Sequence, residues 1–220
     1  AKMRRWKVVI VADGVSAALR AGEAARIAVE AFHEILLNSA EKRQNMSIAL
    51  LRKCYKEAFE RLKNAALETP SREPLLQTTL IAVIETHDRF FITYLGDGDI
   101  WMRRGDGWAI PLMMPHKKGS LLIGGITDTG VKGKPVFIEY SKSFESGEMV
   151  IIGTDGVFDI DGGIDTLILE LEKILRNDKL LNADFDKELT ILLENLHEKY
   201  RFGDNATIGA IVSKKALLSI

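Results

Sequence analysis

Three apolar runs in this chain each lie beside an acidic turn, and this pattern limits the fold more than any other feature of the sequence. The three pairs of run and turn are Val8–Ala12 with Asp13-Gly14, Val150–Ile152 with Asp155-Gly156, and Ala206–Val212 with Asp204-Asn205. β-Branched apolar runs of this length predict buried strands. If the three strands are neighbours, their carboxylates converge and repel one another unless a cation lies between them. Oxygen ligands of this kind favour Mg²⁺ or Mn²⁺.

Composition excludes several classes of protein. Among 220 residues, 30 Lys and Arg balance 31 Asp and Glu, so the net charge of −1 does not favour a nucleic-acid or anionic-membrane partner. No apolar run approaches the ~20 residues that span a bilayer, and the basic start lacks the apolar segment of a signal peptide. Cys54 is the one cysteine, which excludes an internal disulfide and favours a reducing, cytoplasmic compartment.

Helical periodicity predicts two pairs of helices, one early and one late in the chain. The first helix is expected to start after Ser16, whose hydroxyl suits an N-cap, and the second to occupy about residues 48–66. The first helix of the later pair is expected near 167–175, and the second is expected to begin near Asp184 or Asp186 and to extend to about residue 200. The apolar stripe of the first helix comprises Ala24, Ile27, Ala28, Ala31, Phe32, Ile35 and Leu36.

Before, between and after the helix pairs, the sequence predicts strands. The expected ranges are 7–12, 78–85, 89–95, 99–104, 108–112, 136–140, 150–152 and 206–212. The strands from 78 to 112 are expected to form an antiparallel meander, with His87-Asp88 in a hairpin, and residues 113–133 to form a Gly-rich loop. Two stacked sheets, each covered by a helix pair, would bury every apolar stripe. The expected fold class is therefore α+β, a four-layer α-β-β-α sandwich of two mainly antiparallel sheets.

Four short motifs in this order resemble those of the type 2C (PPM-type) metal-dependent serine/threonine protein phosphatases. They are Val11-Ala12-Asp13-Gly14, Gly96-Asp97-Gly98-Asp99, Gly153-Thr154-Asp155-Gly156-Val157-Phe158-Asp159 and Gly203-Asp204-Asn205-Ala206-Thr207. They resemble the family's first Asp-Gly turn, its central Gly-Asp-Ser hairpin, its Ser-Asp-Gly-Leu-x-Asp motif and its closing Asp-Asn-x-Thr motif. The resemblance covers nearly the whole chain and implies a single domain over residues 1–220.

The resemblance also implies a metal centre that holds two Mn²⁺ or Mg²⁺ ions. Asp13 would bridge the two ions, and the backbone carbonyl of Gly14 would bind one of them. Asp155 and Asp204 would hold the other ion. Asp97 matches a position that binds an additional, weaker ion in some relatives.

Two further polar residues would support this centre. Asn205 would hydrogen-bond nearby and orient Asp204, as outer ligand partners commonly do. Asp159 would tie the turn that carries Asp155. The resemblance assigns no side chain as the nucleophile, because a metal-activated water would attack the phosphorus of phosphoserine or phosphothreonine. It thus implies a hydrolase that dephosphorylates proteins in signalling, with a cognate serine/threonine kinase as the source of its substrate.

The sequence departs from the family pattern at two places. The family usually carries an Arg and an acidic pair on a strand before the first Asp-Gly turn, and no Asp or Glu occurs before Asp13 here. Arg4 and Arg5 are interpreted as exposed basic residues. A Gly-rich turn, often with a His, follows that motif in relatives, whereas Val15 follows it here. His116 lies in the Gly-rich loop and is interpreted as a surface residue in preference to a proton donor.

These departures leave three functions open. The first is an active metal-dependent protein phosphatase. The second is a weak or inactive relative that serves as a binding or regulatory module. The third is a metal-dependent hydrolase of small phosphoesters or nucleotides. The acid cluster favours the first, because a scaffold gains nothing from carboxylates that repel one another.

Overall fold

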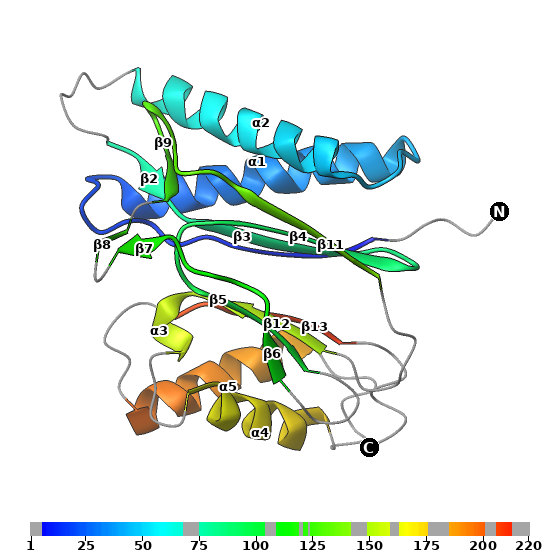
Figure 1. Ribbon diagram of the computed structural model, residues 1–220. Helices are drawn as coiled ribbons and strands as arrows, with labels where there is room; N and C mark the ends of the chain where they lie inside the picture. The colour runs from blue at the N-terminus through cyan, green and yellow to red at the C-terminus, as the bar shows by residue number, and fades with distance from the viewer. Residues whose placement is uncertain are drawn as a thin grey trace. The chain divides into compact units, whose positions relative to one another are not determined.

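The structure is a computed structural model, and it describes residues 6–67, 75–103, 109–118, 121–122, 124–141, 149–158, 163–175, 185–200 and 206–212. The chain divides into two compact units. The first contains Ala1–Asp97 and Pro115–Lys142, and the second contains Gly98–Met114 and Ser143–Ile220. Each unit has its own sheet and its own helices (Figure 1).

An antiparallel four-stranded sheet forms the centre of the first unit. Its strands lie in the order β1 (Lys7–Val11), β3 (Leu80–Glu85), β4 (Arg89–Leu95) and β11 (Val136–Ser141). Every residue of β3 is buried, as expected of its continuous apolar run. The register pairs Val11 with Ile81 and Leu80 with Leu95, so the end of β1 lies beside the start of β3 and the end of β4.

The early helix pair covers one face of this sheet. Helices α1 (Ala21–Glu41) and α2 (Ile48–Ala66) lie side by side over the strands (Figure 1). Their apolar faces share a core with alternate residues of β3, namely Leu80, Ala82 and Ile84. The stripe predicted for α1 is confirmed, since six of its members are buried and Ile35 packs against the same core. The 3.6-residue period therefore identified the face that α1 buries.

The predicted start of α1 is wrong. Helix α1 begins at Ala21, and Arg20 occupies the cap position without a side-chain cap hydrogen bond. Ser16 is exposed in a turn that precedes the helix. The backbone N–H of Val15 donates to the carbonyl of Gln77 and that of Arg20 to the carbonyl of Leu75, at 3.0 and 2.9 Å. These bonds hold the segment against the chain around β2, so the helix starts only after them.

Two small sheets accompany the large one in the first unit. Strands β10 (Gly130–Lys132), β9 (Gly125–Thr127) and β2 (Gln77–Thr78) form one, and β7 (Lys117–Lys118) with β8 (Leu121–Leu122) forms the other. Most of them arise in the stretch that was expected to be a loop. The expected strand 78–85 is split, because β2 pairs with β9 while β3 pairs with β1 and β4. Thr79 lies at the break.

The second unit also has an antiparallel four-stranded sheet. Its order is β13 (Ile208–Val212), β12 (Met149–Gly153), β5 (Asp99–Arg103) and β6 (Ala109–Pro111). The short helix α3 (Asp155–Phe158) follows β12, and α4 (Gly163–Leu175) and α5 (Phe185–Tyr200) cover one face of the sheet (Figure 1). Leucines of both long helices form a second core with Met149 and Ile151 of β12.

The expected meander is also wrong, because β4 and β5 belong to different sheets. The Gly96-Asp97-Gly98 turn joins them without pairing them. Gly96 and Gly98 both adopt positive φ, 117° and 102°, a conformation that favours glycine. The motif that resembles the family's central hairpin is therefore a crossover from one sheet to the other.

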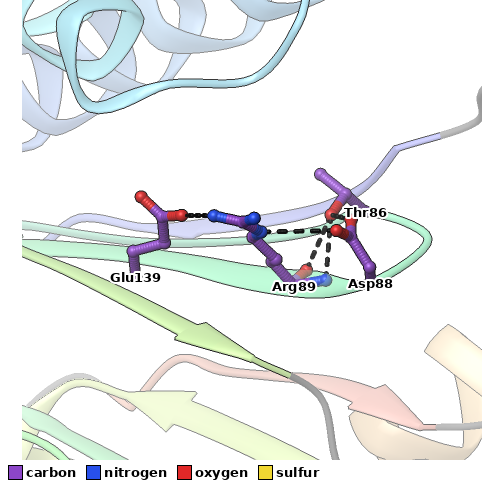
Figure 2. A network of polar contacts seen from close by, with 4 residues as sticks. All are labelled: Thr86, Asp88, Arg89 and Glu139. Carbon is purple, nitrogen blue, oxygen red and sulfur yellow. Dashed lines mark hydrogen bonds and ion pairs between the residues drawn. The ribbon is translucent and has the colours of Figure 1, made fainter.

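The hairpin between β3 and β4 is confirmed, and a polar network holds it (Figure 2). The backbone N–H of Thr86 donates to the carbonyl of Arg89 at 2.8 Å, and the backbone N–H of Arg89 donates to the Thr86 hydroxyl at 3.1 Å. The Arg89 guanidinium contacts Asp88 and also forms an ion pair with Glu139 of β11. The network ties the hairpin to the edge strand, at the end of the sheet opposite to Asp13.

None of the helices in the described part of the chain is both long and apolar enough to cross a bilayer.

Candidate functional site

Asp13 is held through its main chain by two buried threonines. Its N–H donates to the Thr79 hydroxyl at 3.1 Å. Its carbonyl accepts from the Thr79 N–H and from the Thr78 hydroxyl, both at 2.8 Å. Thr78 is 0% and Thr79 4% exposed, so water has little access to the threonine side of these bonds. We call the three bonds the threonine clamp. The clamp gives Asp13 a defined backbone position directly after β1.

Gly14 follows in a position that only glycine fits. A Cβ built there would overlap the carbonyl group of Ala21, the first residue of α1. Gly14 forms an isolated antiparallel bridge with Thr78. The bridging bonds run from Val15 N–H to the Gln77 carbonyl and from Thr79 N–H to the Asp13 carbonyl. The bridge therefore does not use the carbonyl of Gly14 itself, which is the atom that the family resemblance assigns to a metal ion.

His116 fixes the turn that carries Asp97. Its backbone N–H donates to the Gly96 carbonyl at 2.8 Å, and its ring Nδ1 accepts from the Gly96 N–H at 3.1 Å. The ring is half-buried beside Tyr94, and burial lowers the pKa of His116. A neutral ring with an unprotonated Nδ1 fits this bond. The interpretation of His116 as a surface residue is therefore wrong: it anchors the Gly96 turn.

Gly96 also lies directly against the threonine clamp. A Cβ at Gly96 would lie 2.5 Å from the Cβ of Thr79. The two segments approach this closely because glycine has no side chain there. Asp13 and Asp97 thus belong to turns that meet at Thr79. Sequence reasoning missed Thr79 and the anchoring role of His116, because their partners lie 66 and 20 residues away and no local pattern marks these bonds.

Asp155 lies in the second unit, where β12 ends and α3 begins. Its Oδ1 accepts from the N–H of Gly156 at 3.1 Å. The preceding residue, Thr154, is buried and makes two bonds to Thr207. The Thr154 N–H donates to the Thr207 carbonyl and the Thr207 N–H donates to the Thr154 hydroxyl, both at 3.0 Å. The acidic turn after β12 is thereby joined to the chain that leads into β13.

Three of the residues implied by the resemblance, Asp159, Asp204 and Asn205, lie outside the described residues. Within the described ranges, no group of three or more His, Cys, Asp or Glu side chains comes together that could hold a metal ion. Asp13 and Asp97 are described in the first unit and Asp155 in the second. The metal-binding roles of all these residues stay predictions.

The chemistry of the described residues fits a hard divalent ion. Asp13, Asp97 and Asp155 offer carboxylate oxygens, and the bridge leaves the Gly14 carbonyl unused. Carboxylates and backbone carbonyls are the donors that Mg²⁺ and Mn²⁺ prefer. A cysteine mechanism does not fit, because burial raises the pKa of Cys54 to about 12 and keeps the thiol protonated at neutral pH.

Solved phosphatase structures share this fold. The catalytic domain of the serine/threonine protein phosphatase PstP, solved with two manganese ions, matches with a TM-score of 0.69 and 17% identity, over 97% of this chain and 93% of that one. PstP/Ppp of Mycobacterium tuberculosis matches with a TM-score of 0.68 and 15% identity, over 97% and 93%. Stp1 of Staphylococcus aureus matches with a TM-score of 0.66 and 13% identity, over 96% and 85%. These likenesses confirm the expected fold class.

Sequence comparison gives the family. No curated protein matches the chain. The family model described as "Protein phosphatase 2C" matches residues 2–201, which is most of the 220-residue chain. The resemblance found in the four motifs is therefore confirmed, and the chain belongs to the protein phosphatase 2C family.

Proposed function

We propose that this protein is a metal-dependent phosphatase that hydrolyses phosphoserine and phosphothreonine in proteins. The family match over residues 2–201 carries the proposal. The donor chemistry of the acidic turns supports it, since all of their ligand atoms are oxygens. The manganese ions reported with the PstP catalytic domain support the choice of metal.

The residues proposed to hold two Mn²⁺ or Mg²⁺ ions are Asp13, the carbonyl of Gly14, Asp155 and Asp204, with Asp97 for an additional ion. When bound, such ions lower the pKa of a water molecule and stabilise charge on phosphoryl oxygens. The chain's own part is to hold its carboxylates in place. The threonine clamp fixes the backbone that carries the Asp13 carboxylate, and the Thr154–Thr207 bonds fix the chain next to Asp155. Asn205 and Asp159 are proposed to support Asp204 and the Asp155 turn.

The proposed substrate is a phosphoprotein, with a serine/threonine kinase as the source of its phosphate. No side chain is proposed as the nucleophile, in keeping with the high pKa of Cys54. A lone, buried thiol is also what a reducing compartment permits, and we propose a cytoplasmic site of action.

Asp155→Asn provides the test of this function. The full chain would be assayed with Mn²⁺ on a phosphothreonine peptide and on p-nitrophenyl phosphate. We expect turnover by the wild type and a loss on the order of 100-fold or more in the variant, because an amide binds a divalent ion far more weakly than a carboxylate. The matched control is Asp165→Asn, the same substitution at an exposed position in α4, which should retain full activity.

The same assay separates the other functions that the sequence leaves open. Manganese binding without turnover of either substrate would show a regulatory or binding module in place of an enzyme. Turnover of p-nitrophenyl phosphate or nucleotides but not of phosphopeptides would show a small-phosphoester hydrolase. Activity that persists in Asp155→Asn would contradict the proposed ligand set.

A further inference from the structure

We propose that Thr79 is a positioning residue of the metal centre, acting through the backbone of Asp13. The inference rests on the proposed function, because it assigns a role toward the metal ions that Asp13 is proposed to bind. Thr79 would touch neither metal nor substrate. Its hydroxyl and its N–H hold both polar backbone groups of Asp13, at 3.1 and 2.8 Å.

The break between β2 and β3 shows why Thr79 is available for this task. The strands on either side pair in different sheets, β2 with β9 and β3 with β1 and β4. Thr79 belongs to neither strand, and its N–H bonds to Asp13. A threonine at this point supplies a hydroxyl acceptor as well, which an apolar residue of the same shape would not.

Because Thr79 is buried, loss of its hydroxyl should affect the backbone of Asp13. Thr79 is 4% exposed, so no water can easily replace its oxygen if the oxygen is removed. The half-buried Asp13 N–H would then lack its acceptor, and a donor left unsatisfied away from bulk water is unfavourable. Rotation of the Asp13 backbone toward solvent would restore a partner to the N–H, and this rotation would move the carboxylate. Removal of the Thr79 hydroxyl is therefore expected to weaken metal binding although every proposed ligand is still present.

The contact with Gly96 extends the role of Thr79 to the second acidic turn. Gly96 packs against the Cβ of Thr79, and His116 binds both the N–H and the carbonyl of Gly96. Asp97 is the next residue. The bulk of the Thr79 side chain thus supports the Asp97 turn, while its oxygen supports Asp13. A substitution that removes the oxygen but keeps the bulk, and one that does the reverse, can separate the two effects.

The central comparison is Thr79→Val with Thr79→Ser. Valine keeps the branched shape against Gly96 and removes the oxygen, whereas serine keeps the oxygen and removes the methyl group. In metal-free protein we expect faster amide exchange at Asp13 in Thr79→Val, by about tenfold, and near-wild-type exchange in Thr79→Ser. Calorimetric titration should show that Mn²⁺ binds about tenfold more weakly to Thr79→Val than to the wild type. For Thr79→Ser, the loss of Mn²⁺ affinity should be less than about threefold.

Kinetics provide a further readout. At saturating Mn²⁺ we expect the KM for phosphopeptide to be unchanged in Thr79→Val, because Thr79 does not contact substrate, while the Mn²⁺ concentration for half-maximal rate rises about tenfold. If Thr79→Val does not fold, Thr79→Ala against Thr79→Ser replaces the comparison, since these two differ by the oxygen alone.

Wild-type manganese affinity together with wild-type exchange at Asp13 in Thr79→Val would overturn the inference. Equal weakening in the valine and serine variants would also overturn it, because packing and not the hydrogen bond would then be responsible. Failure of the proposed function has a different signature. The wild type would neither bind Mn²⁺ nor hydrolyse phosphoester, while the exchange measurement would still judge the bond between Thr79 and Asp13.

Discussion

His116 shows how one side chain can fix a turn at a distance of 20 residues along the chain. Its Nδ1 accepts the Gly96 N–H, and its own N–H donates to the Gly96 carbonyl. The first bond requires an unprotonated Nδ1, and burial lowers the pKa of the ring. The stability of the first unit should therefore depend on pH.

The direction of that dependence follows from the lowered pKa. As pH falls through the ordinary histidine value of about 6.5, the unfolded chain takes up a proton before the folded one does. The stability contributed by neutral His116 is thus complete above that pH and is lost as pH falls through the lower pKa of the folded state. We expect the urea midpoint of the metal-free protein to fall between pH 7.5 and pH 5, and His116→Asn, which keeps an acceptor but does not titrate, to reduce that fall.

The control for this experiment is His33→Asn, at an exposed position on α1. It removes an imidazole from the same unit without touching the bond between His116 and Gly96. A fall of equal size in wild type and His116→Asn would show that other groups cause it.

At the same scale, the sequence identifies some functional residues and not others. Asp13 and Gly14 could be predicted because an Asp-Gly pair directly after a β-branched run is a local signal. Thr79 could not be predicted, since its bond to Asp13 joins residues 66 apart and a threonine is ordinary in the strand that the sequence predicts at 78–85. Local sequence patterns thus identify the charged residues of the acidic turns and miss the residues that hydrogen-bond to the backbone of those turns.

At the scale of elements, the start of α1 depends on the close approach of Gly14 to Ala21. Gly14→Ala would push its Cβ into the Ala21 carbonyl, which is backbone and cannot move aside easily. We expect the free energy of unfolding to fall by about 1–3 kcal/mol, as for other overpacked sites. Urea denaturation measures this change.

A matched glycine lies one residue into the same helix. A Cβ at Gly22 would meet nothing within 4 Å. Gly22→Ala should therefore be neutral or stabilise the protein by up to ~1 kcal/mol, through the higher helix propensity of alanine. Equal destabilisation by both substitutions would show that the approach of Gly14 to Ala21 is not the cause.

Elements were predictable where their signal is periodic. The stripes of α1 and of the later helices lie within one segment, so the sequence contains the whole pattern. The meander failed because the pairing partner of a strand is not encoded beside it: β5 pairs with β12, about 50 residues on, and not with β4. The cap at Ser16 failed because backbone bonds from Val15 and Arg20 to the chain around β2 delay the helix.

At the scale of the whole molecule, each unit has a separate core. Leu51 of α2 is fully buried in the first core, and Leu171 of α4 is fully buried in the second. Leu51→Ala and Leu171→Ala should each cost about 2–5 kcal/mol. By hydrogen exchange, each variant should lose more protection in its own unit than in the other. Equal losses in both units would show that the two cores open together.

The order of elements was enough to predict the α+β class, and four motifs in order were enough to indicate the family. The single domain stays a prediction. The division into units was not visible in the sequence, because neither unit is a continuous segment and no linker separates them. Such a division depends on contacts between residues that are far apart in the sequence, and composition gives no information on these contacts.

The interleaving of the two units has a consequence for synthesis on the ribosome. Strands β5 and β6 emerge about 40 residues before β12, the other neighbour of β5, and this gap corresponds to roughly 2–8 s at ordinary translation rates. During that interval one edge of the nascent β5 hairpin, with the apolar Ile100 and Met102, has no neighbour to pair with. When the protein is overproduced in a cell with few chaperones, aggregation should therefore begin at this exposed strand edge. A lower growth temperature should raise the yield of folded protein.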